Sequence, residues 1–135
     1  MTIGELAGRA SLAPSAVRFY EKAGVLKAPP RLNGRRSYDE SAAHQLTIIC
    51  FAKATGFSLP EIRVLLHGFP PKTTASARWK KMARTKIAEL DVTLARAQAM
   101  KSILESMTSC RCRTLEQCAS GLARSQRNWR SNTSI

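Results

Sequence analysis

The chain has 135 residues, enough for one compact domain with an extended element and too few for two full domains. Its formal net charge of +13 favours a polyanionic partner, nucleic acid first, because each neutralised phosphate releases counterions. The opening residues MTIGELAGRA lack the basic and apolar regions of a signal peptide, and the longest apolar run, TIICFA, is too short to span a bilayer. We therefore expect a cytoplasmic protein without a membrane partner.

Two short helices are predicted at the start of the chain. Thr2 and Glu5 form a capping-box pattern, and apolar residues at helical spacing follow it to residue 10. Pro14 suits the first position of a second helix, PSAVRFYEK, and Gly24 can end it. Two short helices joined by a short turn are typical of a helix-turn-helix.

A basic hairpin is predicted next. The stretch VLKAPPRLNGRRSYD contains two prolines that exclude a helix, and its Asn33-Gly34 pair favours a tight hairpin turn. We call this basic stretch, residues 25–39, the wing.

Two more helices are predicted after the wing. Asp39 can cap a third helix that ends at Gly56. Ser58 and Glu61 repeat the capping box, and a fourth helix extends to Phe69. The fold class is thus mainly α, with a winged helix-turn-helix domain over residues 1–69 and a linker over residues 70–74.

Residues 75–107 contain neither Pro nor Gly and predict one long helix. At about 1.5 Å per residue, such a helix is roughly 50 Å long. One small domain cannot cover the apolar stripe along it, so we expect the same helix of a second chain to do so, in a coiled coil. The alternative is a helix folded back within one chain. The predicted dimerisation residues are Trp79, Ala83, Ile87, Leu90, Leu94, Ala97 and Leu104.

The stretch CRCRTLEQC contains Cys110, Cys112 and Cys118, in a predicted effector loop over residues 108–120. In a reducing compartment, clustered cysteines are ligands or redox groups more often than a structural disulfide. Thiolates suit soft or borderline ions, namely Cu, Zn, Cd, Pb or Hg. Direct thiol oxidation, a disulfide and a loop without a sensing role remain open. Residues 121–135, rich in Ser, Asn and Arg, predict a disordered tail.

The basic side chains of the second helix and the wing are candidate DNA contacts. Positioning on phosphate uses Arg, Lys and Tyr, whereas base reading uses a few side chains near the start of the second helix. The alternative is a solvated basic face. Nothing in the chain resembles a catalytic set, so no enzyme is expected. The candidate residues are Ser15, Arg18, Tyr20, Lys22, Arg31, Arg35, Arg36 and Tyr38.

Two stretches, TIGELAGRASLAPSAVRFYEKAGVL and NGRRSYDESAAHQLTIICFAKATGFSLPEI, resemble the DNA-binding half of the MerR family of bacterial transcription regulators. The likeness is dense over residues 2–69 and looser to residue 118. It implies a winged helix-turn-helix homodimer joined by an antiparallel pair of long helices and bound to promoter DNA. Effector binding would distort that DNA so that RNA polymerase can engage it.

The resemblance also assigns individual contacts. It implies that Arg18 and Tyr20 contact DNA from the second helix, and Arg36 and Tyr38 from the wing. Arg35 stands where many relatives have an aromatic residue, so the wing is expected to depend more on phosphate charge.

The cysteine segment is similar to two branches of the family. In the divalent-metal branch, a further cysteine stands near the start of the partner's long helix, where this chain has Ser76; Cys112 is a possible replacement. The spacing also matches three of four cysteines that hold a two-iron two-sulfur cluster in the SoxR branch, but Met107 stands at the first position. We therefore favour a thiophilic metal over a cluster. The alternative function is a small thiol-metal binding protein without sequence-specific DNA binding.

Overall fold

The structure is a computed structural model that describes residues 1–130, without the side chains of residues 127 and 128. The described residues are mostly helical and form two compact units, Met1–Arg84 and a second unit from Thr85 onward. Each unit is described by itself. No described helix has the length and apolar character needed to cross a membrane.

The first unit begins with helices α1 (Ile3–Arg9) and α2 (Pro14–Lys22). The predicted capping box is present: the Thr2 hydroxyl accepts from the Glu5 amide at 3.1 Å, and the Glu5 carboxylate accepts from the Thr2 amide at 3.4 Å. Pro14 occupies the first turn of α2. These local contacts set where both helices begin, so the predicted helix-turn-helix outline is confirmed.

The wing is a two-stranded antiparallel hairpin. Strand β1 (Arg31–Leu32) pairs with β2 (Arg35–Arg36), with Arg31 opposite Arg36. Asn33 and Gly34 connect the strands with φ angles of 53° and 78°. Positive φ at both central residues is the requirement that makes Asn-Gly the favoured two-residue turn, and the hairpin prediction is confirmed.

Helices α3 (Glu40–Ala54) and α4 (Leu59–His67) follow the wing. Asp39 accepts from the Ala42 amide at 3.2 Å, and Ser58 and Glu61 form the second capping box. Helix α4 ends at His67, two residues before the predicted end at Phe69.

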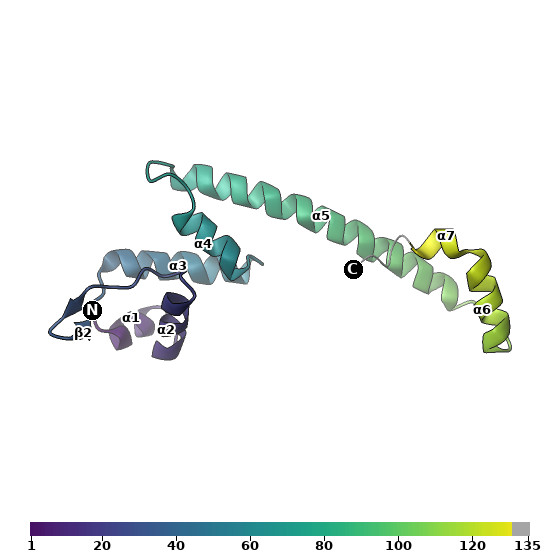
Figure 1. The fold of residues 1–135 in the computed structure, drawn as a ribbon, viewed down its shortest axis with the longest axis horizontal. Helices are drawn as coiled ribbons and strands as arrows, with labels where there is room; N and C mark the ends of the chain where they lie inside the picture. The colour runs from purple at the N-terminus through teal and green to yellow at the C-terminus, as the bar shows by residue number, and fades with distance from the viewer. Residues whose placement is uncertain (131–135) are drawn as a thin grey trace. The chain divides into compact units, whose positions relative to one another are not determined.

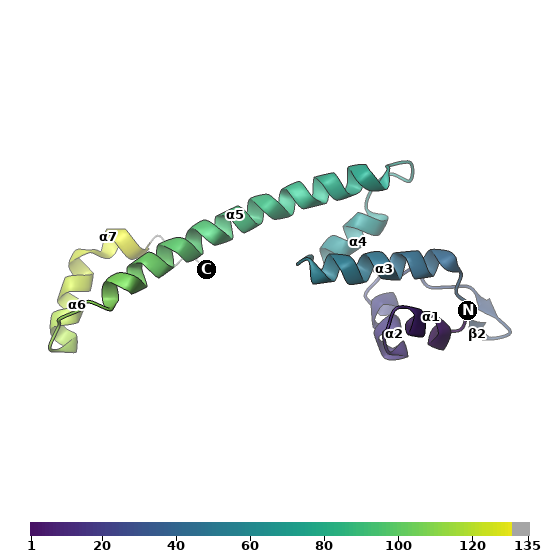
Figure 2. The same cartoon turned by 180° about the vertical axis from the view of Figure 1, so that it is seen from behind.

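The core of the first unit is apolar and continuous. Helix α1 packs against α2 and α3, and α3 packs against α4 (Figures 1 and 2). The residues buried as a whole in the described part of the chain are all aliphatic or aromatic, so hydrophobic burial is the main stabilising term. The largest fully buried side chains are Leu6, Leu26, Leu46, Ile49, Ile62, Val17 and Val25.

The start of helix α5 (Ala75–Met107) also belongs to this unit. The Trp79 ring packs edge-on against Phe51 and Phe57, with centroid distances of 5.7 and 6.1 Å. The Arg78 guanidinium donates to the Leu65 and Leu66 carbonyls of α4, at 3.2 and 3.0 Å. Trp79 therefore packs within its own chain, which differs from its predicted place in the dimerisation stripe.

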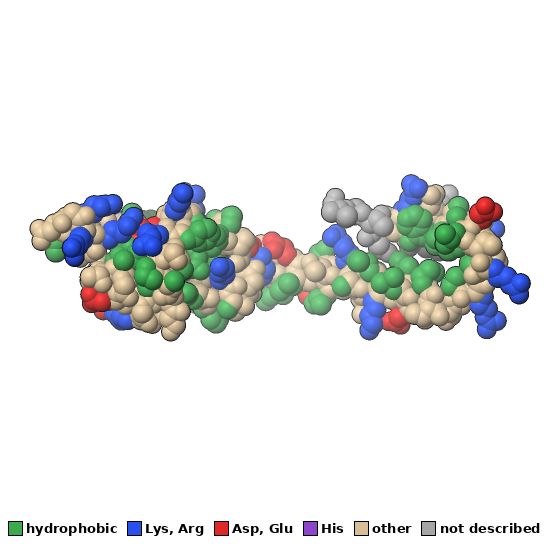
Figure 3. Space-filling view, turned by 90° about the horizontal axis from the view of Figure 1, so that it is seen from below, with side chains coloured by type: hydrophobic (Ala, Val, Ile, Leu, Met, Phe, Trp, Pro, Cys, Tyr) green, Lys and Arg blue, Asp and Glu red, His purple; other side chains and the backbone are tan. Residues whose placement is uncertain are grey.

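The second unit contains most of α5, which has the predicted bounds and no buried residue. Ile87, Leu90, Leu94 and Leu104 are 49–66% exposed on it. Hydrophobic side chains remain uncovered along its middle (Figure 3).

Two helices occupy the segment predicted as the end of the loop and a disordered tail: α6 (Leu115–Arg124) and α7 (Gln126–Trp129). Thr114 caps α6 by accepting from the Gln117 amide at 3.1 Å, and the Trp129 indole donates to the Leu122 carbonyl at 3.2 Å. The loop is therefore shorter than predicted, and Cys118 lies on a helix. Residues 131–135 of the predicted tail lie outside the described residues.

Candidate nucleic-acid interface and cysteine cluster

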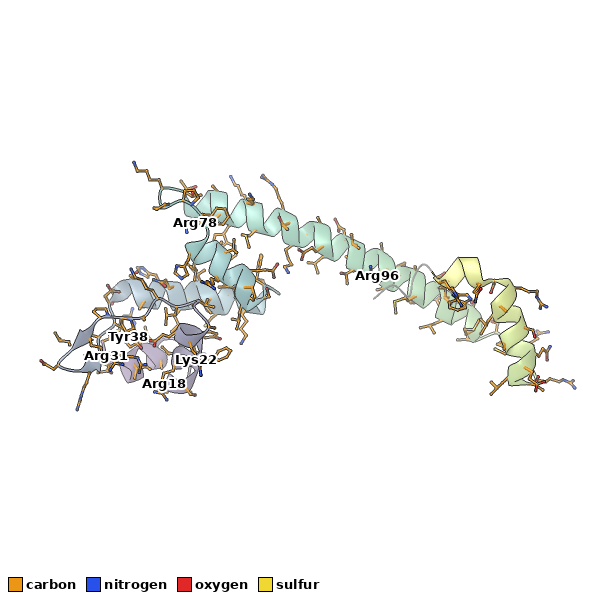
Figure 4. All side chains as sticks on the ribbon, viewed as in Figure 1. Arg18, Lys22, Arg31, Tyr38, Arg78 and Arg96 are labelled. Carbon is orange, nitrogen blue, oxygen red and sulfur yellow. The ribbon has the colours of Figure 1, made fainter. Side chains whose placement is uncertain are left out.

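Helix α2 presents a polar and basic side to solvent. Ser15, Arg18 and Lys22 are exposed, whereas Val17 and Tyr20 point into the core. This follows from the helical period, which places residues 17 and 20 on the side opposite residues 15, 18 and 22. Arg18 and Lys22 lie on the same helix in Figure 4, close to Arg31 and Tyr38 of the wing region.

The wing adds further arginines. Arg31 and Arg35 are exposed, and the Arg31 guanidinium donates to the Gly34 carbonyl at 3.2 Å, across the turn. Arg36 is half-buried. Exposed guanidinium groups on a short hairpin are the kind of donor that contacts DNA phosphates.

Tyr20 and Tyr38 are in the core, with relative exposures of 5% and 3%. The Lys53 ammonium donates to the Tyr20 hydroxyl at 3.5 Å and lies 5.5 Å from the centre of the Tyr20 ring. Both rings are thus part of the hydrophobic core of the first unit. This differs from the prediction that both side chains face DNA, because their spacing also fits a buried helix face and strand end.

Glu21 joins α2 to the end of the wing, a contact that the sequence analysis did not predict. Its Oε1 accepts a short hydrogen bond from the Tyr38 hydroxyl, and its Oε2 lies 3.3 Å from Nε of Arg36. The Glu21 side chain is 8% exposed. Burial and the Glu21 hydrogen bond hold the pKa of Tyr38 well above its usual value. Because the partners are 15 or more positions apart in the chain, no local sequence pattern predicts the contact.

The three cysteines of the C-terminal segment are free thiols. Cys110 and Cys112 are exposed, and Cys118 is half-buried on α6. A hydrogen bond from the Cys112 amide to the Cys110 sulfur lowers the pKa of Cys110, and the Cys112 thiol adds to this. The pKa of Cys112 is raised, first by the hydrogen bond to Cys110 and then by burial, with smaller effects of the Cys118 side chain. The titration of Cys112 is therefore linked mainly to Cys110 and more weakly to Cys118.

No assembled metal site exists within the described residues: no three His, Cys, Asp or Glu side chains converge to hold an ion. Ser76 is exposed in the first turn of α5. Cys50 is half-buried on α3, apart from the other thiols in sequence. His67 is exposed, and its Nε2 lies 2.7 Å from the Val25 carbonyl oxygen.

The comparisons with known proteins bear on this arrangement. Residues 1–68 match the family described as "MerR HTH family regulatory protein", and residues 43–107 match "MerR, DNA binding". The chain belongs to the MerR family. As a MerR regulator it is a transcription factor and no enzyme. MerR regulators bind promoter DNA as dimers, so promoter DNA and a second copy of the chain are its partners.

Several MerR regulators are similar to it over most of their length. The transcriptional regulator HmrR of Rhizobium leguminosarum bv. viciae is 30% identical, with 90% of this chain and 99% of HmrR covered. The regulator CueR of Salmonella typhi is 34% identical, with 82% of this chain and 81% of CueR covered. The crystal structure of PbrR691 from Ralstonia metallidurans CH34, in complex with lead(II), superposes with a TM-score of 0.68. It is 33% identical, and 84% of this chain and 90% of PbrR691 are covered.

Proposed function

We propose that this MerR regulator is a cytoplasmic, metal-responsive homodimer that distorts its promoter when a thiophilic ion binds Cys110, Cys112 and Cys118. The observation that carries the proposal is the grouping of three free thiols, two of them exposed, in the short segment that follows the long helix α5.

Three thiols in one short segment are a donor set for soft or borderline ions, namely Cu, Zn, Cd, Pb or Hg. The lead(II) complex of the similar regulator PbrR691 supports this class of ligand. Since the described side chains hold no assembled site, the ion itself draws the thiols together and releases their protons. A two-iron two-sulfur cluster is disfavoured because Met107 would have to replace a thiolate.

The proposed DNA contacts come from α2 and the wing. The exposed side chains Arg18, Lys22 and Arg35, with the outer end of Arg36, suit phosphates, and Ser15 and Arg18 suit base edges near the start of α2. Arg31 adds a further charge beside the turn. Each phosphate contact makes binding more sensitive to salt, so affinity should fall steeply between 50 and 200 mM salt, by roughly 10³-fold or more for six contacts.

The dimer is proposed to form through the uncovered side of α5. Leucines at residues 90, 94 and 104 and the isoleucine at 87 are all about half exposed or more, and Ala83 and Ala97 continue the stripe. The same helix of a second chain, running antiparallel, would bury this stripe. Trp79 is left out because Phe51 and Phe57 already cover it.

Ion capture would then act on DNA through α5. An ion that binds more tightly to one dimer geometry shifts the population toward it, and the two DNA-binding units bend or untwist the promoter accordingly. RNA polymerase is affected only through the shape of the promoter.

Elemental analysis and ultraviolet absorbance test the sensor on anaerobically purified protein. Addition of Cu(I), Zn(II) or Pb(II) should give a bound ion, and for Cu(I) and Pb(II) a thiolate charge-transfer band, which Cys110→Ser, Cys112→Ser and Cys118→Ser weaken. Cys50→Ser, on α3, is the matched control and should bind like the wild type. If none of the ions binds and all three variants regulate normally in cells, the sensor assignment is wrong while DNA binding stands. A visible iron-sulfur spectrum would instead identify a cluster.

A further inference from the structure

Glu21 is a buried carboxylate between the two elements proposed to contact DNA. It lies in the last turn of α2, one position before the exposed Lys22, and its side chain is 8% exposed. Both of its oxygens are bonded to groups at the end of the wing: Oε1 to the Tyr38 hydroxyl and Oε2 to Arg36. A buried carboxylate with two such partners costs desolvation, so it marks a contact that matters for geometry.

The Tyr38 hydroxyl has one hydrogen to donate, and Glu21 accepts it. The raised pKa of Tyr38 means that this hydrogen stays in place at physiological pH. The remaining lone pairs of the hydroxyl oxygen can only accept, and a phosphate diester offers no donor. While the bond to Glu21 holds, Tyr38 cannot serve as a phosphate ligand.

The Arg36 guanidinium is shared between Glu21 on one side and solvent on the other. Its Nε lies 3.3 Å from Oε2 of Glu21 in an ion pair, which leaves the two terminal nitrogens of the guanidinium for another acceptor. The Arg36 side chain is 37% exposed, so this outer end reaches solvent. A guanidinium held at Nε has fewer rotamers to lose when its outer end binds a phosphate.

We propose that Glu21 is a positioning residue for DNA binding, which fixes the wing against α2, and that Tyr38 acts through Glu21 and does not touch DNA. The proposal rests on α2 and the wing being the DNA interface. Glu21 presents the outer end of Arg36 and holds the arginines of α2 and the wing at one spacing. Because these arginines are already ordered in the free protein, they lose less conformational entropy when DNA binds.

Removal of the Glu21 charge distinguishes two explanations, because a positioning role and simple electrostatics predict opposite changes in DNA affinity. Glu21→Gln makes the chain one unit more positive than its formal charge of +13, which by itself should strengthen binding to DNA. Positioning predicts about tenfold weaker binding, since a charge-assisted bond that orders the interface is lost. The matched control is Glu40→Gln, which removes an equally charged but 65% exposed carboxylate bonded to Arg9, and it should bind as tightly as the wild type or more so.

The measurement is fluorescence anisotropy on the chain's own upstream DNA over a range of salt concentrations. Loss of the Arg36 phosphate contact in Glu21→Gln should lower the slope of log K against log salt by about one. Tighter binding by Glu21→Gln, or an unchanged affinity and slope, would overturn the proposal. Circular dichroism checks that each variant is folded.

Tyr38→Phe keeps the buried ring and carries the test if Glu21→Gln does not fold. It should weaken binding with Glu21 present and have little further effect in Glu21→Met, which removes the acceptor at similar length. Additive losses would mean that Tyr38 contacts DNA by itself, and the proposal would fail. Arg18→Ala distinguishes failure of the proposed DNA interface from failure of the positioning role. If Arg18→Ala binds DNA like the wild type, the proposed interface is wrong. If Arg18→Ala weakens binding but the Glu21 and Tyr38 variants do not, only the positioning role of Glu21 is wrong.

Discussion

At the scale of single residues, the two exposed cysteines differ although they are two positions apart. The Cys112 amide stabilises a thiolate at Cys110, so the pKa of Cys110 is lowered, whereas the pKa of Cys112 is raised. A lower pKa gives a larger thiolate fraction at any pH between the two values. Cys110 should therefore be the first thiol to lose its proton and the first to engage an ion or an electrophile.

Alkylation measures this order directly. In the metal-free protein, the rate of reaction of Cys110 with iodoacetamide should reach half its maximum at a lower pH than that of Cys112, as followed by peptide mass spectrometry. Cys110→Ala is the control: it removes the partner that raises the pKa of Cys112, so Cys112 should then react at lower pH. Identical profiles for both thiols would contradict the hydrogen-bond arrangement.

Residue-scale contacts were the part least accessible from sequence. Exposed Arg18, Lys22 and Arg35 were predicted because α2 and the wing have clear periods and turn signals. The burial of Tyr38 and its bond to Glu21 were not predicted. That contact joins residues 17 positions apart and depends on how the elements pack. Periodicity tells which face a residue is on but not which partner it meets.

At the scale of elements, the capping boxes were predictable because they are local. Ser58 and Glu61 satisfy two amides at the start of α4. Ser58→Ala should lower the free energy of unfolding by about 1 kcal/mol, measured by urea denaturation. Ser102→Ala, on the exposed part of α5, should cost nothing, because Ala is the better helix former. Equal losses in both variants would show that the cap contributes no stability.

The turn of the wing is a second element whose chemistry is local. Gly34 has a φ of 78°, so a side chain there is strained even though the space around it is empty. Gly34→Val should loosen the hairpin at a cost of about 1–2 kcal/mol and weaken DNA binding in anisotropy measurements. Gly8→Ala in the interior of α1 also meets no neighbour and should instead stabilise, by roughly 0.5–1 kcal/mol. Unchanged DNA binding by Gly34→Val would mean that the wing is not a contact.

Helix α6 shows where element prediction failed. Its start has a Thr cap and Glu116 in the first turn, but few apolar residues follow, and the Ser- and Arg-rich composition resembles disorder. Leu115, Cys118 and Leu122 lie on one side at intervals of three and four. A short amphipathic helix of this kind is difficult to distinguish from a tail when its partner surface is unknown.

At the scale of the whole molecule, the proposed dimer depends on the long stripe of α5. Leu94 is 66% exposed in a single chain, which is costly unless a second chain covers it. Leu94→Lys should shift the dimer to monomer by about tenfold or more in sedimentation analysis, because a charge would be buried at the seam. Ala95→Lys, an exposed change that lies about 100° around the same helix from Leu94, is the control. A stable Leu94→Lys dimer would exclude this stripe as the interface.

The bounds of α5 were predicted from the absence of Pro and Gly, but the division of the chain into two units was not. The division depends on Trp79 meeting Phe51 and Phe57, which come from distant parts of the sequence. A sequence pattern along one helix does not predict which of its turns pack against the hydrophobic core of another part of the chain.

The contacts of Arg78, at the junction between α4 and α5, have a mechanical consequence. One guanidinium bonds to two carbonyls of α4 and to the Thr73 carbonyl of the linker, and it lies 5.7 Å from the Phe69 ring. The prolines at 70 and 71 mark a break in the sequence, yet this clamp stiffens the joint. Within the first unit, a rotation of the start of α5 about its own axis would thus be passed to α4 and would not be absorbed by the linker.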